Sequence, residues 1–181
     1  MLIRNPIIWL MRLRHRRGYG IHSPFAYDLT TQVLYSPGTY YADPLLDRLW
    51  PPVVRWLHLR PRADCRLLFR LANHWQPRLI AAPGLTPTEW NYLREGCHRA
   101  VIDPAMPRGQ ADMLVLRTDC PQWADHVGDD SLLVVLGLRS NRHLWRSILD
   151  HPRTRVTFDL YDVGLAVFTP RLNRQDYIIN W

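Results

Sequence analysis

The chain has 181 residues, a hydrophobic fraction of 47% and a formal net charge of +7. This length is sufficient for one domain with a buried core, and the hydrophobic fraction excludes an intrinsically disordered chain. The excess positive charge is carried by arginine, because the sequence contains no lysine. A basic excess attracts nucleic acid, anionic lipid or acidic proteins without choosing among them.

Cysteine usage and hydropathy bear on the redox compartment of the protein and on its relation to membranes. Cys65, Cys97 and Cys120 are odd in number and widely spaced, which favours a reducing cytoplasm over a disulfide framework or a metal site. No apolar run reaches the roughly 18 to 20 residues that span a bilayer. Residues 2–13 are largely apolar, but a secretory signal would place its positive charges first and end in small residues. We expect a helix packed on the domain or on a partner, with a peripheral membrane contact as the alternative.

The first part of the chain predicts helices. We expect them at residues 24–34, 44–59 and 63–75. Ser23 is a good cap for the first helix, and Pro24 suits its first position. Pro51 and Pro52 should break or kink the second helix, since proline removes a hydrogen-bond donor. The third has the clearest helical spacing of apolar side chains.

From residue 77 onward, short apolar runs alternate with helices. Strands are expected at residues 78–82, 100–103, 113–116, 132–136, 156–160, 163–168 and 177–179. Intervening helices are expected at residues 86–93, 121–127 and 141–149. Alternation of this kind indicates an α/β fold whose mostly parallel sheet is covered on both faces. The last three strands leave little room for helices, so we expect a C-terminal hairpin and an antiparallel last edge.

Three blocks of the sequence resemble a bacterial methyltransferase-like family. Residues 18–27, with Tyr40 and Tyr41 downstream, resemble its opening signature. Residues 66–80 resemble the helix that leads into its first strand, and residues 155–168 resemble its closing hairpin. The resemblance implies a three-layer Rossmann-like methyltransferase fold and S-adenosylmethionine as cofactor. We expect one domain over residues 1–181, with an N-terminal helical extension over 1–60 and a shortened core over 61–181.

The resemblance also assigns candidate cofactor-binding positions. In such enzymes the first strand ends in an acidic residue and a Gly-rich turn. Here Ala81 stands in the place of the acid and Pro83 in the place of a glycine, so that only Gly84 is left to form the turn. Asp103 stands where a carboxylate would bind the ribose hydroxyls, and the alternative is an aspartate that opens the turn at Pro104. Ala81, Gly84 and Asp103 are therefore the candidates.

Carboxylates for a metal are also missing. Metal-dependent members of the resembled family carry an aspartate after the fourth strand and an acidic pair after the fifth. Arg117 and Leu136-Gly137 occupy these places, and one nearby carboxylate, Asp119, is too few for a hard cation. We expect no metal site. If chemistry is retained, His22 and Asp119 are the candidate catalytic residues, although the favoured role of His22 is to tie down its own loop.

The length of the segment between the first and third predicted strands also indicates a reduced cofactor site. Residues 81–112 have room for one helix, one strand and a Pro-rich loop. The resembled enzymes fit two strand-helix units into this interval. We expect a sheet of about six or seven strands with a reduced or absent cofactor cleft.

Three functions follow from the sequence. The first is a degenerate methyltransferase-like protein without a cofactor that acts as a binding or scaffold module. The second is an active small-molecule O-methyltransferase with a rebuilt S-adenosylmethionine pocket. The third is a basic adaptor for nucleic acid or anionic membrane. Its contact residues would be the arginines of the N-terminus: Arg4, Arg12, Arg14, Arg16 and Arg17. A homodimer or a protein partner is also expected, with no surface assigned.

Overall fold

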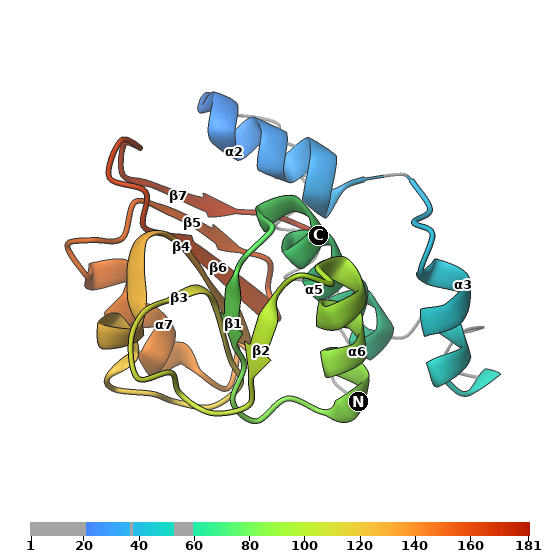
Figure 1. Cartoon of the computed structure of the whole chain (residues 1–181). Coiled ribbons are helices and arrows are strands. Elements are labelled where there is room, and N and C mark those ends of the chain that lie inside the picture. The colour runs from blue at the N-terminus through green and yellow to red at the C-terminus, as the bar shows by residue number, and fades with distance from the viewer. Residues whose placement is uncertain (1–20, 37, 53–59) are drawn as a thin grey trace.

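The structure is a computed structural model that describes residues 21–36, 38–52 and 60–181. These residues form one seven-stranded sheet with helices around it (Figure 1). The strands are β1 (Leu79–Ala81), β2 (Val101–Asp103), β3 (Ala111–Leu116), β4 (Val127–Leu136), β5 (Val156–Asp159), β6 (Val163–Val167) and β7 (Gln175–Ile178). The helical elements are α2 (Pro24–Asp28), η2 (Leu29–Leu34), α3 (Asp43–Leu46), η3 (Asp47–Leu49), α5 (Arg60–Trp75), α6 (Pro87–Gly96), η4 (Trp123–His126) and α7 (Arg142–Asp150).

The strand order confirms the expected α/β fold. The sheet runs β2-β1-β3-β4-β6-β5-β7, and its first four strands are parallel to one another. Strand β6 is antiparallel to both β4 and β5, as expected for a C-terminal hairpin. Only residues 104–110 separate β2 from β3, which agrees with the expected loss of a strand-helix unit from this interval.

The outermost strand corrects one expectation. We expected the last edge to be antiparallel, but β7 runs parallel to its neighbour β5. The reason lies in the hairpin: Val167 at the end of β6 pairs with Val156 at the start of β5. The chain therefore leaves β6 at the end of the sheet where β5 begins, and the short connection over residues 168–174 returns it alongside β5 in the same direction.

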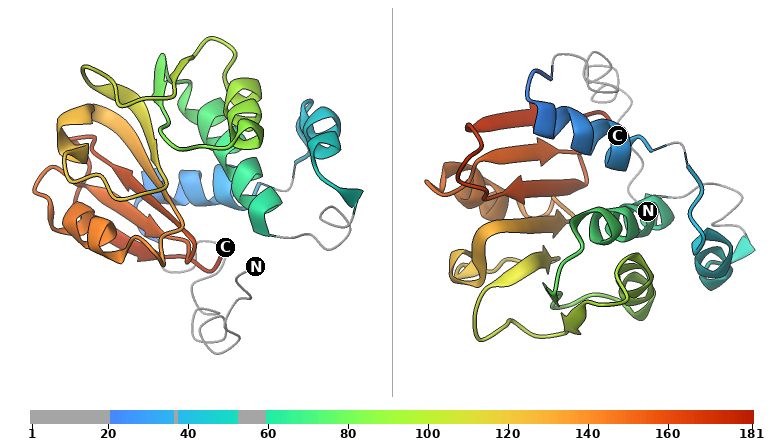
Figure 2. Two further views of the ribbon diagram at one scale, coloured as in Figure 1. Left: turned by 90° about the horizontal axis from the view of Figure 1, so that it is seen from below. Right: turned by 45° about the horizontal axis from the view of Figure 1, so that its top comes forward.

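Both faces of the sheet are buried. Neighbouring residues of each strand point to opposite faces, so each strand contributes side chains to both cores. Leu132 and Val134 of β4 belong to the core beneath η2, α5 and α6. Leu133 and Val135 belong to the core beneath α7 and η4. Figure 2 shows α2 and α5 on one face of the sheet and α7 on the other. The molecule thus has the three layers predicted from alternating strands and helices.

The N-terminal part of the described chain is held by caps and by the C-terminus. Ser23 caps α2 as predicted, since its Oγ accepts a hydrogen bond from the Ala26 amide at 3.4 Å. Trp181 donates its indole N–H to the Leu34 carbonyl at 2.6 Å, and the Tyr35 hydroxyl donates to the Asn180 carbonyl. The α2–η2 segment is therefore anchored to the C-terminal end of the chain, which lies beyond β7.

One predicted helix is shorter in the structure, and another is interrupted where prolines were expected to break it. The helix expected at residues 121–127 is only the 3₁₀ turn η4, and β4 already begins at Val127 instead of residue 132. The helix expected at 44–59 is interrupted after η3 at Trp50 and Pro51, as the proline pair predicts; Pro52 is helical again, and residues 53–59 lie outside the described part. Within the described ranges, no helix is long and apolar enough to cross a bilayer.

Candidate functional site

The candidate site lies where the carboxyl ends of β1 and β3 meet. From β1 the chain passes through α6 to β2 on one side, whereas β3 pairs on the other side of β1. Open α/β sheets bind ligands at such a point, because the connections diverge there. The residues that decide what can bind are those that follow β1 and β3.

The turn after β1 offers few groups for a ligand. Ala81 is buried at the end of the strand, and the Ala82 amide is already bonded to the Asp103 carbonyl at 2.9 Å. Pro83 has no N–H to donate. Gly84 has φ +74°, so this turn requires the left-handed backbone that glycine adopts readily. The turn therefore keeps its glycine but has no acidic side chain and one donor fewer.

The helix that follows this turn has an internal anion at its N-terminus. Thr86 caps α6 by accepting from the Glu89 amide at 3.4 Å. The Glu89 carboxylate accepts in return from the Thr86 amide and hydroxyl, both at 2.8 Å. Helix N-termini bind anions through free N–H groups and the helix dipole. Here a buried glutamate of the protein itself takes that place.

The same glutamate also pairs with an arginine from the neighbouring strand end. Oε1 of Glu89 accepts a charge-assisted hydrogen bond from Nη2 of Arg117, which directly follows β3. The Glu89 side chain is 10% exposed and that of Arg117 is 39% exposed. This ion pair joins the segment after β1 to the end of β3. Arg117, at the place where the resemblance expects an aspartate, thus has a structural partner.

The thiol beneath this pair is not a nucleophile. Cys65 of α5 is 2% exposed. Burial, and then the nearby carboxylates of Glu89 and Asp64, raise the pKa of the Cys65 thiol. The thiol therefore stays protonated at neutral pH, and only a thiolate would react.

The end of β4 is likewise used for structure. Asn141 donates its amide Nδ2 to the carbonyls of Arg117 at 2.8 Å, Leu136 at 3.0 Å and Gly137 at 3.2 Å. One side chain thereby holds together the carboxyl ends of β3 and β4. Gly137 turns the chain there with φ +63°. The positions at which the resemblance places an acidic pair form this turn instead.

Asp103 lies at the end of β2, where a ribose ligand is expected. One of its carboxylate oxygens, however, already accepts a hydrogen bond within the protein. Oδ1 accepts from the Ala105 amide at 2.8 Å across Pro104. This is the hydrogen bond of an Asx turn, the alternative that the Asp-Pro pair offered. A ribose-binding role for Asp103 stays a prediction.

The structure does not bring the two candidate catalytic residues together. His22 is exposed and lies just before α2, on the face of the sheet that carries α2 and α5. Asp119 follows β3 and faces the opposite side, beside α7. Residues 18–20 of the signature that contains His22 lie outside the described part of the chain. A shared catalytic role for His22 and Asp119 has no geometry to support it.

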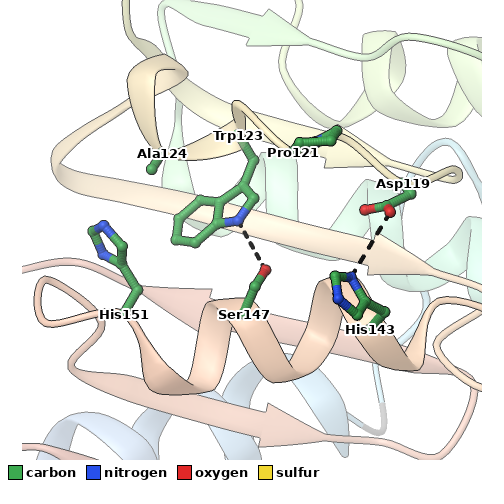
Figure 3. Close-up of a pocket in the computed structure, with 7 residues that line it drawn as sticks. All are labelled: Asp119, Pro121, Trp123, Ala124, His143, Ser147 and His151. Carbon is green, nitrogen blue, oxygen red and sulfur yellow. Dashed lines mark hydrogen bonds and ion pairs between the residues drawn. The ribbon is translucent and has the colours of Figure 1, made fainter.

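A pocket beside α7 was not expected from the sequence. It has a volume of about 270 Å³. Its lining consists of Asp119, Pro121, Trp123, Ala124, His143, Ser147 and His151 (Figure 3). The spacing of His143, Ser147 and His151 by four residues could have shown that α7 presents them on one side. The buried Trp123 donates its indole N–H to Ser147 Oγ at 3.2 Å.

The titratable groups of this pocket are only loosely organised. Asp119 Oδ2 lies 4.0 Å from His143 Nδ1, and the two side chains are 53% and 93% exposed. Burial, followed by the nearby Arg153, lowers the pKa of His151, so its ring is neutral at neutral pH. Among the residues that the structure describes, no three histidine, cysteine, aspartate or glutamate side chains could hold a metal ion.

Comparison with solved structures finds a methyltransferase from Geobacter sulfurreducens. The two chains are 17% identical, with a TM-score of 0.45, and the match covers 72% of this chain and 90% of the other. No family model matches the chain, and no curated protein is significantly similar to it. The assignment of a Rossmann-like methyltransferase fold therefore relies on the strand order and pairing described above.

Proposed function

We propose that this protein is a degenerate methyltransferase-like module that does not use S-adenosylmethionine and acts by binding other molecules or as a scaffold. The observation that carries this proposal is the double use of Glu89. Its carboxylate caps α6 and pairs with Arg117 at the point where the connections of the sheet diverge. The group that a ligand would have to meet there is already bound within the protein.

The residues around this point do not fit S-adenosylmethionine. The ammonium group of the cofactor needs a carboxylate, and Ala81 supplies none. Glu89 is nearby, but it is neutralised by Arg117. The cofactor's own carboxylate needs backbone donors, yet Pro83 has none and the Thr86 amide is bonded to Glu89. A sulfonium cation would also meet the guanidinium of Arg117. Methyl transfer is therefore no part of the proposed function.

The alternative of an active O-methyltransferase requires Asp103, His22 and Asp119 to work around one pocket. Asp103 is engaged in its turn, and the other two lie on opposite faces of the sheet. The third function, an adaptor that uses the N-terminal arginines, involves residues outside the described part and stays a prediction. The proposed location is the cytoplasm, which the three free cysteines favour.

Calorimetric titration of the full chain with S-adenosylmethionine, and then with S-adenosylhomocysteine, tests the proposal. We expect no saturable heat with either ligand. Asp103→Asn is the matched variant, since its amide oxygen still accepts from the Ala105 amide while the charge is lost. Saturable binding to the wild type that weakens in Asp103→Asn would overturn the proposal and support the active enzyme. Saturable binding that the variant leaves unchanged would also overturn it and would exclude Asp103 as the ribose ligand.

A further inference from the structure

The segment formed by α3 and η3 lies at the periphery of the molecule and has two unlike sides. Figure 1 shows it beside α6 and well away from the sheet. Its inward side is apolar and buried. Ala42 and Leu46 pack there against Cys65, Phe69 and Tyr92 of α5 and α6. The segment is therefore attached to the domain through a small core cluster of its own.

Both acidic residues of this segment are turned towards the body of the protein. Arg66 of α5 pairs with Asp43 at 3.3 Å and with Asp47 at 3.7 Å. Asp43 also accepts from the Tyr40 amide at 3.0 Å, and it is almost fully buried. Arg66 thereby balances one of the two negative charges of the segment on its inner side.

Apolar side chains and one arginine of this segment are exposed to solvent. Tyr41, Leu45 and Leu49 are 65%, 59% and 44% exposed, and Arg48 is exposed beside them. We call these four residues the α3 stripe. Six large hydrophobic side chains are exposed in the described part of the chain, and three of them belong to this stripe. Exposed apolar residues gathered on one short segment indicate a contact surface, whereas scattered ones do not.

The tyrosine of the stripe is held in place. Its hydroxyl donates to the Glu95 carbonyl at 2.7 Å and lies 3.0 Å from His98 Nε2. Its ring also meets Phe69 edge-on, with the centroids 6.2 Å apart. The exposed ring is thus preorganised and would lose little conformational freedom on binding.

We propose that the α3 stripe is a peripheral contact with an anionic lipid bilayer. Exposed apolar and aromatic side chains next to an arginine match the boundary between acyl chains and negative headgroups. The net charge of +7 adds a long-range attraction to such a surface. A second copy of the chain would carry the same positive charge, and a nucleic-acid backbone offers no apolar surface for Leu45 and Leu49. This proposal does not depend on the outcome of the cofactor titration.

Vesicle co-sedimentation of the full chain tests the proposal. We expect binding to vesicles of phosphatidylcholine with phosphatidylglycerol and little binding to phosphatidylcholine alone. The double variant Leu45→Ser with Leu49→Ser should lower the partition coefficient about tenfold, since each leucine would otherwise bury further apolar surface. Val101→Ser and Ile178→Ser are matched controls, because these side chains are similarly exposed on β2 and β7. Both controls should bind as the wild type does.

Three results would overturn the proposal. The first is a wild type that does not bind anionic vesicles. The second is a double variant that binds them as tightly as the wild type does. That result would assign the binding to arginines elsewhere. The third is a lipid-free, concentration-dependent dimer, seen by analytical ultracentrifugation, that the double variant abolishes. If the double variant does not fold, as judged by circular dichroism, Arg48→Glu replaces it. Unchanged binding of Arg48→Glu to anionic vesicles then overturns the proposal.

Discussion

Helices α6 and α7 begin at the same edge of the sheet, yet their first turns are unlike. The first turn of α6 contains Glu89, which completes a capping box and pairs with Arg117. The first turn of α7 has no acidic residue and no side-chain cap, and it begins with Arg142 and His143. One helix N-terminus is neutralised within the protein and the other is not. The turn after β1, which has no acidic side chain, is thus followed by contacts that stabilise the fold there.

The largest effect is expected from removing the carboxylate that makes this difference. Glu89→Ala leaves Arg117 without its partner and removes the capping box of α6. We expect the free energy of unfolding to fall by about 3 kcal/mol, measured by urea denaturation. Thr86→Ala, which removes only the cap, should cost about 1 kcal/mol. Equal losses in the two variants would show that the ion pair contributes nothing.

The next largest effect compares two glycines, one at the end of α6 and one packed against α7, by the stability lost when a Cβ is added. A Cβ added at Gly96, the last residue of α6, would lie 2.5 Å from the backbone oxygen of Phe69. One added at Gly164 of β6 would lie 2.6 Å from the Trp145 ring of α7, a side chain that can shift. We expect Gly96→Ala to destabilise by about 2–3 kcal/mol and Gly164→Ala by about 1 kcal/mol. Thermal unfolding measures both, and the reverse order would contradict this account.

A smaller effect of opposite sign is expected at α7. Arg142→Glu replaces a positive charge at the N-terminus of the helix with a negative one. Because no acidic residue occupies that turn, the variant should gain about 0.5 kcal/mol of stability at low salt, and this gain should shrink as salt is added. Arg142→Gln, with no charge at this position, should lie between the two. A stability loss in Arg142→Glu would mean that Arg142 has a role in the fold.

The smallest effect is a pH dependence from the pocket beside α7. Burial lowers the pKa of His151 below its ordinary value of 6.5 in the folded chain. The unfolded chain therefore binds a proton more readily, so this residue should make stability fall as the pH drops through and below 6.5. His151→Gln should flatten the unfolding midpoint over this range. An equal slope in both proteins would assign the dependence to other groups.

Much of the fold could be predicted because it depends on local patterns. The period of apolar side chains separated strands from helices, and Ser23 and Pro51 marked the start of α2 and the end of η3. The helix predicted at residues 121–127 failed for a tertiary reason. Its apolar residues Trp123 and Val127 pack into the core beneath α7, as a 3₁₀ turn and the start of β4.

The candidate site could be predicted only in part. Ala81, Pro83 and Arg117 stand in the sequence where the resemblance expects cofactor or metal ligands, so the absence of acidic residues at Ala81 and Arg117 was readable directly. The capping box at Thr86 and Glu89 was readable too, from their spacing of three residues. The pairing of Glu89 with Arg117 was not, since 28 positions separate the two and the order of strands brings them together.

The sequence alone therefore determined most of the secondary structure, the fold class and the positions without acidic groups, because caps, periodicity and residue identity act over a few neighbouring positions. Tertiary structure alone decided that β7 runs parallel to β5, that His22 and Asp119 lie on opposite faces, and that Tyr41, Leu45 and Leu49 remain exposed. Each of these results depends on which distant segments pack together, and the sequence pattern near each residue does not specify that.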